Sequence, residues 1–300
     1  MRGVRIAVSG ASGLLGSALV PALREAGHEV VRLVRRDAVA PDEVRWDPAA
    51  GFIDTEALGA TEAMVNLSGA TIGRRWTASR KREILDSRVE TTSLLARTTT
   101  ALDPPPAVLV CTGGVGIYGN RRDEVLTEES DLGTGFLADV GRAWEAAAQP
   151  ARDAGIRVVN FRQGIVLTRK GGALQKMLPP FRMGVGGVIG DGSQSMSWIA
   201  LDDAVGAVQH ALSTEGLRGP VNAVSPMPVT NRGFTKALGR VLGRPTILPM
   251  PAFAARLAFG EMADALLLAS LRVVPDRLRG TGYAFRYPEL EPALRHLLAG

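Results

Sequence analysis

The chain has 300 residues, 46% of them hydrophobic, which suits one large or two modest globular domains. No apolar run approaches the ~18 residues that span a bilayer, the single cysteine excludes an intramolecular disulfide, and three scattered histidines argue against a His/Cys metal cluster. The net charge of +5 forms no basic block interleaved with aromatic residues, so we expect no nucleic-acid partner, no membrane partner and no bound metal.

The N-terminal residues predict a strand, a glycine loop and a helix in succession. An apolar run over 4–8 precedes the loop, and an amphipathic stretch over 17–26 follows it. Gly10 would make the tight turn, Gly13 would let the backbone approach a pyrophosphate, and Gly16 would let the helix pack against the sheet. Phosphates would then lie over unpaired N–H groups at the positive end of the helix. This context predicts a nucleotide-binding site, and the alternative is a structural surface turn.

The second strand, predicted over 29–34, ends in two arginines. Folds that bind NAD place an acidic residue there, which contacts the ribose 2′-hydroxyl. Here Arg35 and Arg36 occupy that place, and guanidinium groups pair well with a 2′-phosphate. We therefore expect NADP(H) as cofactor. Asp37 would take the acidic role if the strand ran longer, and a solvated basic strand end is the structural alternative.

Strands and helices then alternate in the way that builds a parallel sheet. We expect strands over 63–67, 107–111, 157–161, 165–167, 198–201 and 220–223, and helices over 79–98, 136–151, 231–243 and 252–270. Another helix should begin at 204, capped by Asp202 and Asp203. Residues 171–192 are rich in glycine, methionine and proline, which predicts a mobile covering loop.

This order of elements predicts an α/β fold. It should contain an NAD(P)-binding Rossmann-type doubly wound parallel sheet and a smaller C-terminal α/β lobe over a substrate cleft. We expect the Rossmann domain over 1–170, with 199–224 returning to it, and a substrate or lid lobe over 171–300. The single Cys111 fits a reducing compartment and the N-terminus lacks a signal-peptide layout, so we expect a cytoplasmic protein.

Short blocks spread along the whole chain carry a resemblance to a known family. They are 9–13, 66–69, 74–77, 87–88, 172–181, 196–199, 202–203, 219–222, 229–231 and 285–288. On these blocks the chain resembles the extended short-chain dehydrogenase/reductase superfamily and, within it, the atypical YfcH-like sugar-nucleotide epimerase family. The Met-Leu-Pro-Pro-Phe and Met-Ser-Trp-Ile blocks are more specific than the glycine loop. Extended members are often dimers, and we expect a monomer or a homodimer here.

The resemblance implies a set of cofactor contacts from five parts of the chain. They are Gly10, Ser12, Gly13, Leu14 and Leu15 at the pyrophosphate with Gly16 behind them, Arg35 and Arg36 at the 2′-phosphate, Leu67, Ser68 and Gly69 beside the adenosine half, Glu83 and Arg88 on the next helix, and Cys111, Thr112, Gly113, Gly164, Ile165 and Val166 near the nicotinamide. For Glu83 and Arg88, an exposed pair or a salt bridge is the structural alternative.

The catalytic pattern of the superfamily is missing from this chain. Active members use a tyrosine as general acid/base with a lysine four residues later, whose charge favours the phenolate. The helix expected over 136–151 has neither residue. Tyr118 and Thr112 remain as candidates, and a substrate contact suits Tyr118 better than catalysis because Arg122 follows it in a loop.

Two carboxylates on the same predicted helix, Asp139 and Glu145, are alternative acid/base groups, although their spacing favours surface charges. Two functions stay open. One is an NADP-dependent oxidoreductase or epimerase that acts on a small polar molecule such as a nucleotide-sugar, with acid/base residues that depart from the superfamily pattern. The other is an NADP(H)-binding sensor or scaffold without hydride chemistry, because the Tyr/Lys pair is absent.

Overall fold

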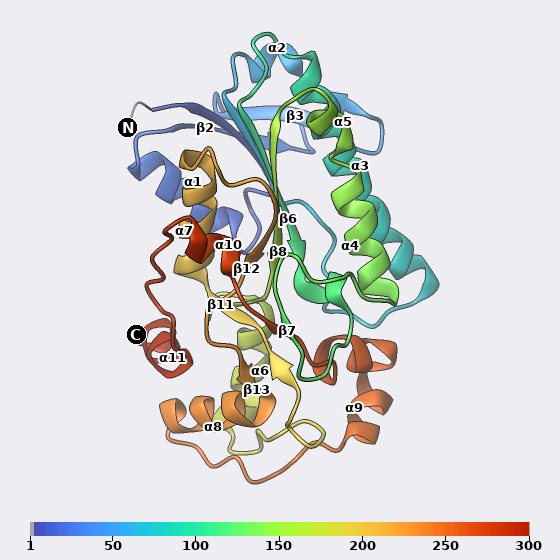
Figure 1. The fold of residues 1–300 in the computed structure, drawn as a ribbon, viewed down its shortest axis with the longest axis vertical. Coiled ribbons are helices and arrows are strands. Elements are labelled where there is room, and N and C mark those ends of the chain that lie inside the picture. The colour runs from blue at the N-terminus through green and yellow to red at the C-terminus, as the bar shows by residue number, and fades with distance from the viewer. Residues whose placement is uncertain (1–2, 300) are drawn as a thin grey trace.

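The computed structural model describes residues 3–299 and has an eight-stranded sheet at its centre (Figure 1). Its strands are β1 (Arg5–Ser9), β2 (Glu29–Val34), β3 (Glu43–Asp47), β4 (Phe52–Ile53), β5 (Ala63–Asn66), β6 (Val108–Gly114), β8 (Arg157–Gln163) and β12 (Gly219–Ala223). Their order is β12-β8-β6-β5-β1-β2-β3-β4, and only the β3–β4 pair is antiparallel. The predicted parallel sheet is confirmed. Its order reverses at β1, where open α/β sheets bind ligands.

Helices cover both faces of this sheet (Figure 1). On one face lie α1 (Gly16–Glu25), α7 (Leu201–Ser213) and α10 (Asp276–Gly280), and on the other α3 (Ala78–Ala101), α4 (Phe136–Ala146) and α5 (Gln149–Asp153). Side chains alternate between the two faces along a strand, so Ile6 and Val8 enter the core beneath α1 while Ala7 enters the core beneath α3. Such continuous apolar strands are typical of a sheet covered on both sides. A single turn of helix, α2 (Thr55–Leu58), lies beyond β4.

The rest of the chain forms a smaller lobe at the lower end of the molecule (Figure 1). Its elements are β9 (Ile165–Leu167), α6 (Gly172–Arg182), β10 (Ser195–Met196), β11 (Trp198–Ala200), β13 (Val229–Thr230), α8 (Asn231–Leu242), α9 (Ala252–Phe259), the π-helical turn η2 (Ala263–Leu267), β14 (Arg272–Val273) and α11 (Leu290–Leu298). Helices α6, α8 and α11 share one apolar core around Trp198. Before α4 the chain forms a 3-10 turn, η1 (Val115–Tyr118), and a short strand, β7 (Val125–Leu126), which pairs with β14.

The covering loop predicted over 171–192 is wrong in its first half, because α6 occupies it. Leu174, Leu178 and Phe181 lie on one face of this helix and are buried in the core of the lobe. Apolar residues at this spacing stabilise a helix by packing. Pro179 and Pro180 lie in its last turn, where each lacks the N–H group that would bind the carbonyl four residues earlier, so packing of the apolar face outweighs that loss.

Other boundaries also differ from the predictions. The helix expected over 136–151 divides into α4 and α5, and the helix expected over 252–270 ends at Gly260, whose φ is +62°. Helix α7 begins at Leu201, so Asp202 and Asp203 lie in its first turn and do not cap it. Strand β11 pairs with β9 and not with the large sheet, whereas β12 does pair with β8.

Candidate functional site

The glycine loop connects β1 to α1 at the carboxyl edge of the sheet, and its backbone approaches its neighbours too closely for side chains. Gly10 has φ +66°, and a Cβ there would lie 2.8 Å from the carbonyl group of Leu67. A Cβ on Gly16 would lie 2.3 Å from the carbonyl oxygen of Gly10. Within residues 3–299, the N–H groups of Ser12 and Leu14 have no protein acceptor. The loop therefore presents free donors at a helix N-terminus, as anion sites do.

Three segments from distant parts of the sequence meet at this loop. Leu67, at the end of β5, and Val166, on β9, pack against the same core cluster as the loop. A Cβ on Gly171 would lie 2.6 Å from the Leu14 side chain, so the turn before α6 lies directly on the glycine loop. The turn that enters α6 thus packs against one side of the glycine loop.

The structure separates the two arginines that follow β2. Arg36 forms two hydrogen bonds with the buried carboxylate of Glu43, at 2.8 and 2.6 Å. The bonds from Arg36, with a further one from the Val39 N–H group, lower the pKa of Glu43 to about 2. Arg35 is exposed and has no hydrogen-bonding or carboxylate partner in the described chain. Of these two arginines, Arg35 is the one that can bind an anionic ligand without breaking an ion pair.

A buried polar network fixes the ends of β1 and β5 to helices α3 and α4. Asn66 Oδ1 accepts the Ser9 hydroxyl at 2.7 Å and the Ser68 N–H at 3.1 Å. Asn66 Nδ2 donates to Thr92 at 2.9 Å, and the indole of Trp144 donates to the same threonine at 2.8 Å. Sequence patterns gave no signal for this network, since its members come from four elements.

Arg88 lies on α3 facing the loop after β5. It donates to the carbonyl oxygen atoms of Ala70 and Ile84, at 2.9 and 3.0 Å, and its guanidinium lies 4.8 Å from the centre of the Trp144 ring. It has no carboxylate partner within residues 3–299. Burial, with a smaller contribution from the charge of Arg80, lowers the pKa of Arg88 to about 10, so it remains a cation at neutral pH.

Glu83, predicted beside Arg88, has a different environment. Its carboxylate is largely exposed and pairs with Arg80, which also donates to the carbonyl oxygen of Thr71. Glu83 is therefore engaged in an ion pair along α3, with its own carboxylate exposed.

The residues predicted beneath the nicotinamide lie at the end of β6. Thr112 is buried, and its hydroxyl donates to the backbone oxygen of Asn66 at 3.0 Å. Cys111 points into the core beneath α3, where burial raises the pKa of its thiol to about 12. A Cβ on Gly113 would lie 3.0 Å from the carbonyl oxygen of Phe161. The Thr112 hydroxyl is committed to the sheet, and the Cys111 thiol is a core group.

Tyr118 is fully buried, which argues against both roles considered for it. Its hydroxyl donates to Asn222 at 2.7 Å and accepts from Arg162 at 2.9 Å. Burial raises the pKa of the Tyr118 phenol, and Arg162 offsets part of that effect. Arg162 in turn forms two hydrogen bonds with Glu145, at 2.8 and 3.0 Å. Glu145 therefore belongs to a buried ion pair and is not the surface charge that its helical spacing suggests.

Helix α4 presents apolar residues where a Tyr/Lys pair would be expected. Val140 and Trp144, four residues apart, form its buried face, and Val140 packs against Trp76 and Met262. Asp139 pairs with Arg142 on the exposed side of the helix. Of the carboxylates on this helix, neither faces the glycine loop.

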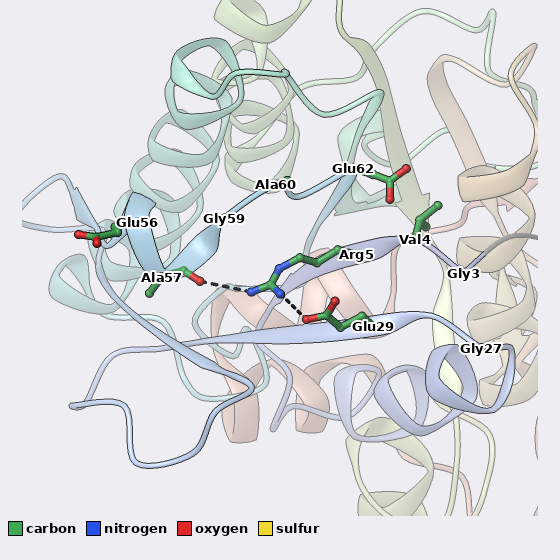
Figure 2. Close-up of a pocket in the computed structure, with 10 residues that line it drawn as sticks. All are labelled: Gly3, Val4, Arg5, Gly27, Glu29, Glu56, Ala57, Gly59, Ala60 and Glu62. Carbon is green, nitrogen blue, oxygen red and sulfur yellow. Dashed lines mark hydrogen bonds and ion pairs between the residues drawn. The ribbon is translucent and has the colours of Figure 1, made fainter.

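A cavity of about 470 Å³ lies at the opposite edge of the sheet (Figure 2). Glu29, Glu56 and Glu62 line it, and Arg5 binds both Glu29 and the carbonyl oxygen of Ala57 across it. Ligands of open parallel sheets bind at the carboxyl ends of the strands, so this cavity is not the cofactor site.

Among residues 3–299, no three His, Cys, Asp or Glu side chains lie close enough together to hold a metal ion. No helix in the same part of the chain combines the length and the apolar character that crossing a bilayer requires.

Several known proteins are similar to this chain in sequence and in fold. Residues 6–223 match the NAD dependent epimerase/dehydratase family, and residues 250–297 match a domain of unknown function, DUF1731. Epimerase family protein Mb2239 from Mycobacterium bovis is 44% identical over 290 residues, which are 96% of each chain.

Two solved structures are also similar to this chain. One is human epimerase family protein SDR39U1 (isoform 2) with NADPH, with TM-score 0.90, 36% identity and 98% of both chains covered. The other is the nucleoside-diphosphate sugar epimerase from Corynebacterium glutamicum, with TM-score 0.81 and 36% identity over 99% of this chain and 58% of that one. These similarities confirm the resemblance carried by the sequence blocks. The chain belongs to the NAD dependent epimerase/dehydratase family.

Proposed function

We propose that this protein binds NADPH at the carboxyl edge of its sheet and is an oxidoreductase or epimerase that acts on a small polar molecule such as a nucleotide-sugar. The free arginine after β2 carries the proposal: Arg35 has no partner, while the adjacent Arg36 is held by Glu43. A guanidinium in that place recognises a 2′-phosphate, which distinguishes NADPH from NADH. NADPH, when bound, supplies a hydride.

The remaining contacts follow from the geometry of the loop and its neighbours. The free N–H groups at Ser12 and Leu14 would hold the pyrophosphate, and Leu67, Ser68 and Gly69 would lie beside the adenosine half. Arg88 would add a positive charge from α3. The human relative was crystallised with NADPH, and the Corynebacterium relative is named as a nucleoside-diphosphate sugar epimerase, which supports the cofactor and the substrate class.

One observation favours a second candidate function, NADPH binding without hydride chemistry. Val140 and Trp144 form the buried face of α4, and the hydroxyl groups of Tyr118 and Thr112 are both used inside the protein. None of these groups is placed to exchange a proton with a substrate. A redox sensor or scaffold needs no such group.

Titration of the purified protein with NADPH and NADH, followed by nucleotide fluorescence, tests cofactor binding. Arg35→Ala should weaken NADPH binding by about 1.5–3 kcal/mol, a factor of about 10–150, because it removes a charge-assisted contact. NADH binding should change little. Arg36→Ala is the matched control and should affect NADPH less, since this guanidinium is paired with Glu43. Equal loss of both nucleotides in Arg35→Ala would contradict the assignment.

Turnover then separates the two functions. With a panel of nucleotide-sugars and small carbonyl compounds, an oxidoreductase should oxidise NADPH, and an epimerase should convert a nucleotide-sugar into its epimer. Tight NADPH binding with neither reaction across the panel would favour the sensor or scaffold.

A further inference from the structure

A group of large apolar side chains is exposed at the lower end of the C-terminal lobe. Met183, Ile247 and Phe253 are 70%, 75% and 72% exposed. We call the whole group the apolar rim, and its members are Met183, Val185, Ile247, Leu248, Phe253 and Leu257. Exposed apolar groups of this size are common singly, but a contiguous set marks an interaction surface.

The rim residues come from three segments, of which the first two lie side by side and the third follows directly in the chain. A Cβ on Gly184 would lie 3.7 Å from Pro245, and the Met250 N–H donates to the carbonyl oxygen of Val188 at 2.8 Å. The chain after α6 and the chain between α8 and α9 therefore lie side by side, along the lower end of the molecule (Figure 1). Phe253 and Leu257 follow on α9, where residues four apart share a face.

The segments that carry the rim are cationic and contain no acidic residue. Residues 164–190 include four Lys or Arg, residues 232–260 include five, and neither stretch has an Asp or a Glu. Some of these cations have partners from elsewhere, such as Arg256 with Asp264. Arg182 and Arg244 are exposed beside the rim and have no carboxylate partner within the described residues. The surface therefore complements a partner that is both apolar and negatively charged.

We propose that the apolar rim, with Arg182 and Arg244, docks this protein on the surface of an anionic lipid bilayer. Exposures above two thirds mean that Met183, Ile247 and Phe253 stand out from the surface and do not line a groove, which suits insertion among lipid headgroups. A second copy of the chain would bring its own Arg182 and Arg244 to the same contact, where like charges repel. The sequence led us to expect no membrane partner because it contains no spanning segment, and surface docking needs none.

Co-sedimentation of the full chain with vesicles tests this docking. We expect binding to vesicles of phosphatidylcholine and phosphatidylglycerol in equal parts, and weak binding to phosphatidylcholine alone. Each arginine near an anionic surface contributes about fivefold in affinity, so Arg182→Glu with Arg244→Glu should reduce binding by about thirtyfold or more. Ile247→Ser with Phe253→Ser should reduce it by at least about tenfold, because less apolar surface is buried.

Matched controls lie far from the rim. Val39→Ser removes another exposed apolar side chain, 80% exposed, and Arg97→Glu reverses an exposed charge on α3; both should bind vesicles as the wild type does. Thermal melting shows that each variant is folded. Failure of the wild type to bind anionic vesicles, or equal binding by the rim variants, would overturn the proposal. So would a dimer in size-exclusion chromatography that the rim variants convert to monomer, since the rim would then join two copies.

Discussion

Gly16 determines how closely α1 approaches the end of β1. A Cβ there would lie 2.3 Å from the Gly10 oxygen and 2.7 Å from the Ala11 Cα, and both are backbone atoms that cannot move independently. We expect Gly16→Ala to destabilise the protein by about 1–3 kcal/mol through overpacking and to abolish NADPH binding. Thermal melting and nucleotide titration measure the two effects.

Gly13→Ala provides the comparison at the same loop. A Cβ on Gly13 would meet only the Gly10 oxygen, at 3.1 Å, so this variant should keep most of its stability. A Gly16→Ala protein that melts like the wild type would show that close packing at this position is not required.

Single residues show which parts of the candidate site the sequence was sufficient to predict and which it was not. The glycine spacing identified the loop because the turn, the pyrophosphate approach and the helix packing each require a glycine at a known place. The sequence did not predict the division of roles between Arg35 and Arg36. That division depends on Glu43, which lies on β3, a strand that was missed although Val44 and Trp46 alternate with charged residues in Glu43–Asp47.

At the scale of elements, α4 shows why helical spacing alone misleads. Glu145 was expected on the surface, yet it pairs with Arg162 on β8, whose side chain is only 5% exposed. Burial alone would lower the pKa of Arg162, but the hydrogen bonds and the charge of Glu145 raise it above its usual range. The partner comes from a strand that the helix pattern does not specify, so only the structure could reveal the pair.

Glu145→Gln should therefore destabilise the protein by about 3 kcal/mol, because it leaves the buried Arg162 without a counter-charge. Chemical denaturation measures the change in the free energy of unfolding. Asp139→Asn on the same helix breaks the exposed pair with Arg142 and should cost less than about 0.5 kcal/mol. Similar losses in the two variants would mean that the Arg162 pair is no more important than a surface pair.

Helix α6 shows that packing can produce a helix where the local sequence predicts a loop. Its glycines and prolines suggested a loop, whereas Leu174, Leu178 and Phe181 pack into the core that α8 and α11 share. Tertiary packing outweighs weak helix propensity when one face can be buried. The covering role expected of this segment remains a prediction, supported by the contact of Gly171 with Leu14.

At the scale of the whole molecule, the C-terminal part of the chain returns to the Rossmann sheet. Asp203 on α7 is fully buried and accepts the N–H groups of Arg286 and Tyr287, at 2.7 and 2.9 Å, as well as the Tyr283 hydroxyl. Strand β14 pairs with β7 nearby. The parallel pairing in the large sheet followed from the alternating pattern, but two-residue strands have no pattern to recognise. The boundary between the lobes stays a prediction.

Glu128 is a second point where the C-terminal part is attached, and it makes that attachment sensitive to pH. Its Oε1 accepts the N–H groups of Asn222 and Arg277, at 2.9 and 3.3 Å, while its buried Oε2 has no partner within the described residues. Burial raises the pKa of Glu128 above its usual value of 4.5, and the two N–H groups offset part of that effect. The folded protein therefore holds the Glu128 proton more tightly than the unfolded chain does.

The sign of the pH dependence follows from that shift. The favourable contribution of protonated Glu128 is complete below about pH 4.5 and is lost as the pH rises through the higher pKa of the folded state. Glu128→Gln removes this titration and keeps an oxygen for the Asn222 N–H. We expect the free energy of unfolding of the variant to gain on that of the wild type as the pH rises from about 4.5 toward and above neutrality. Urea denaturation across this range measures the free energy of unfolding of both proteins. Parallel dependence of the two free energies on pH would mean that Glu128 ionises as freely in the folded protein as in the unfolded chain.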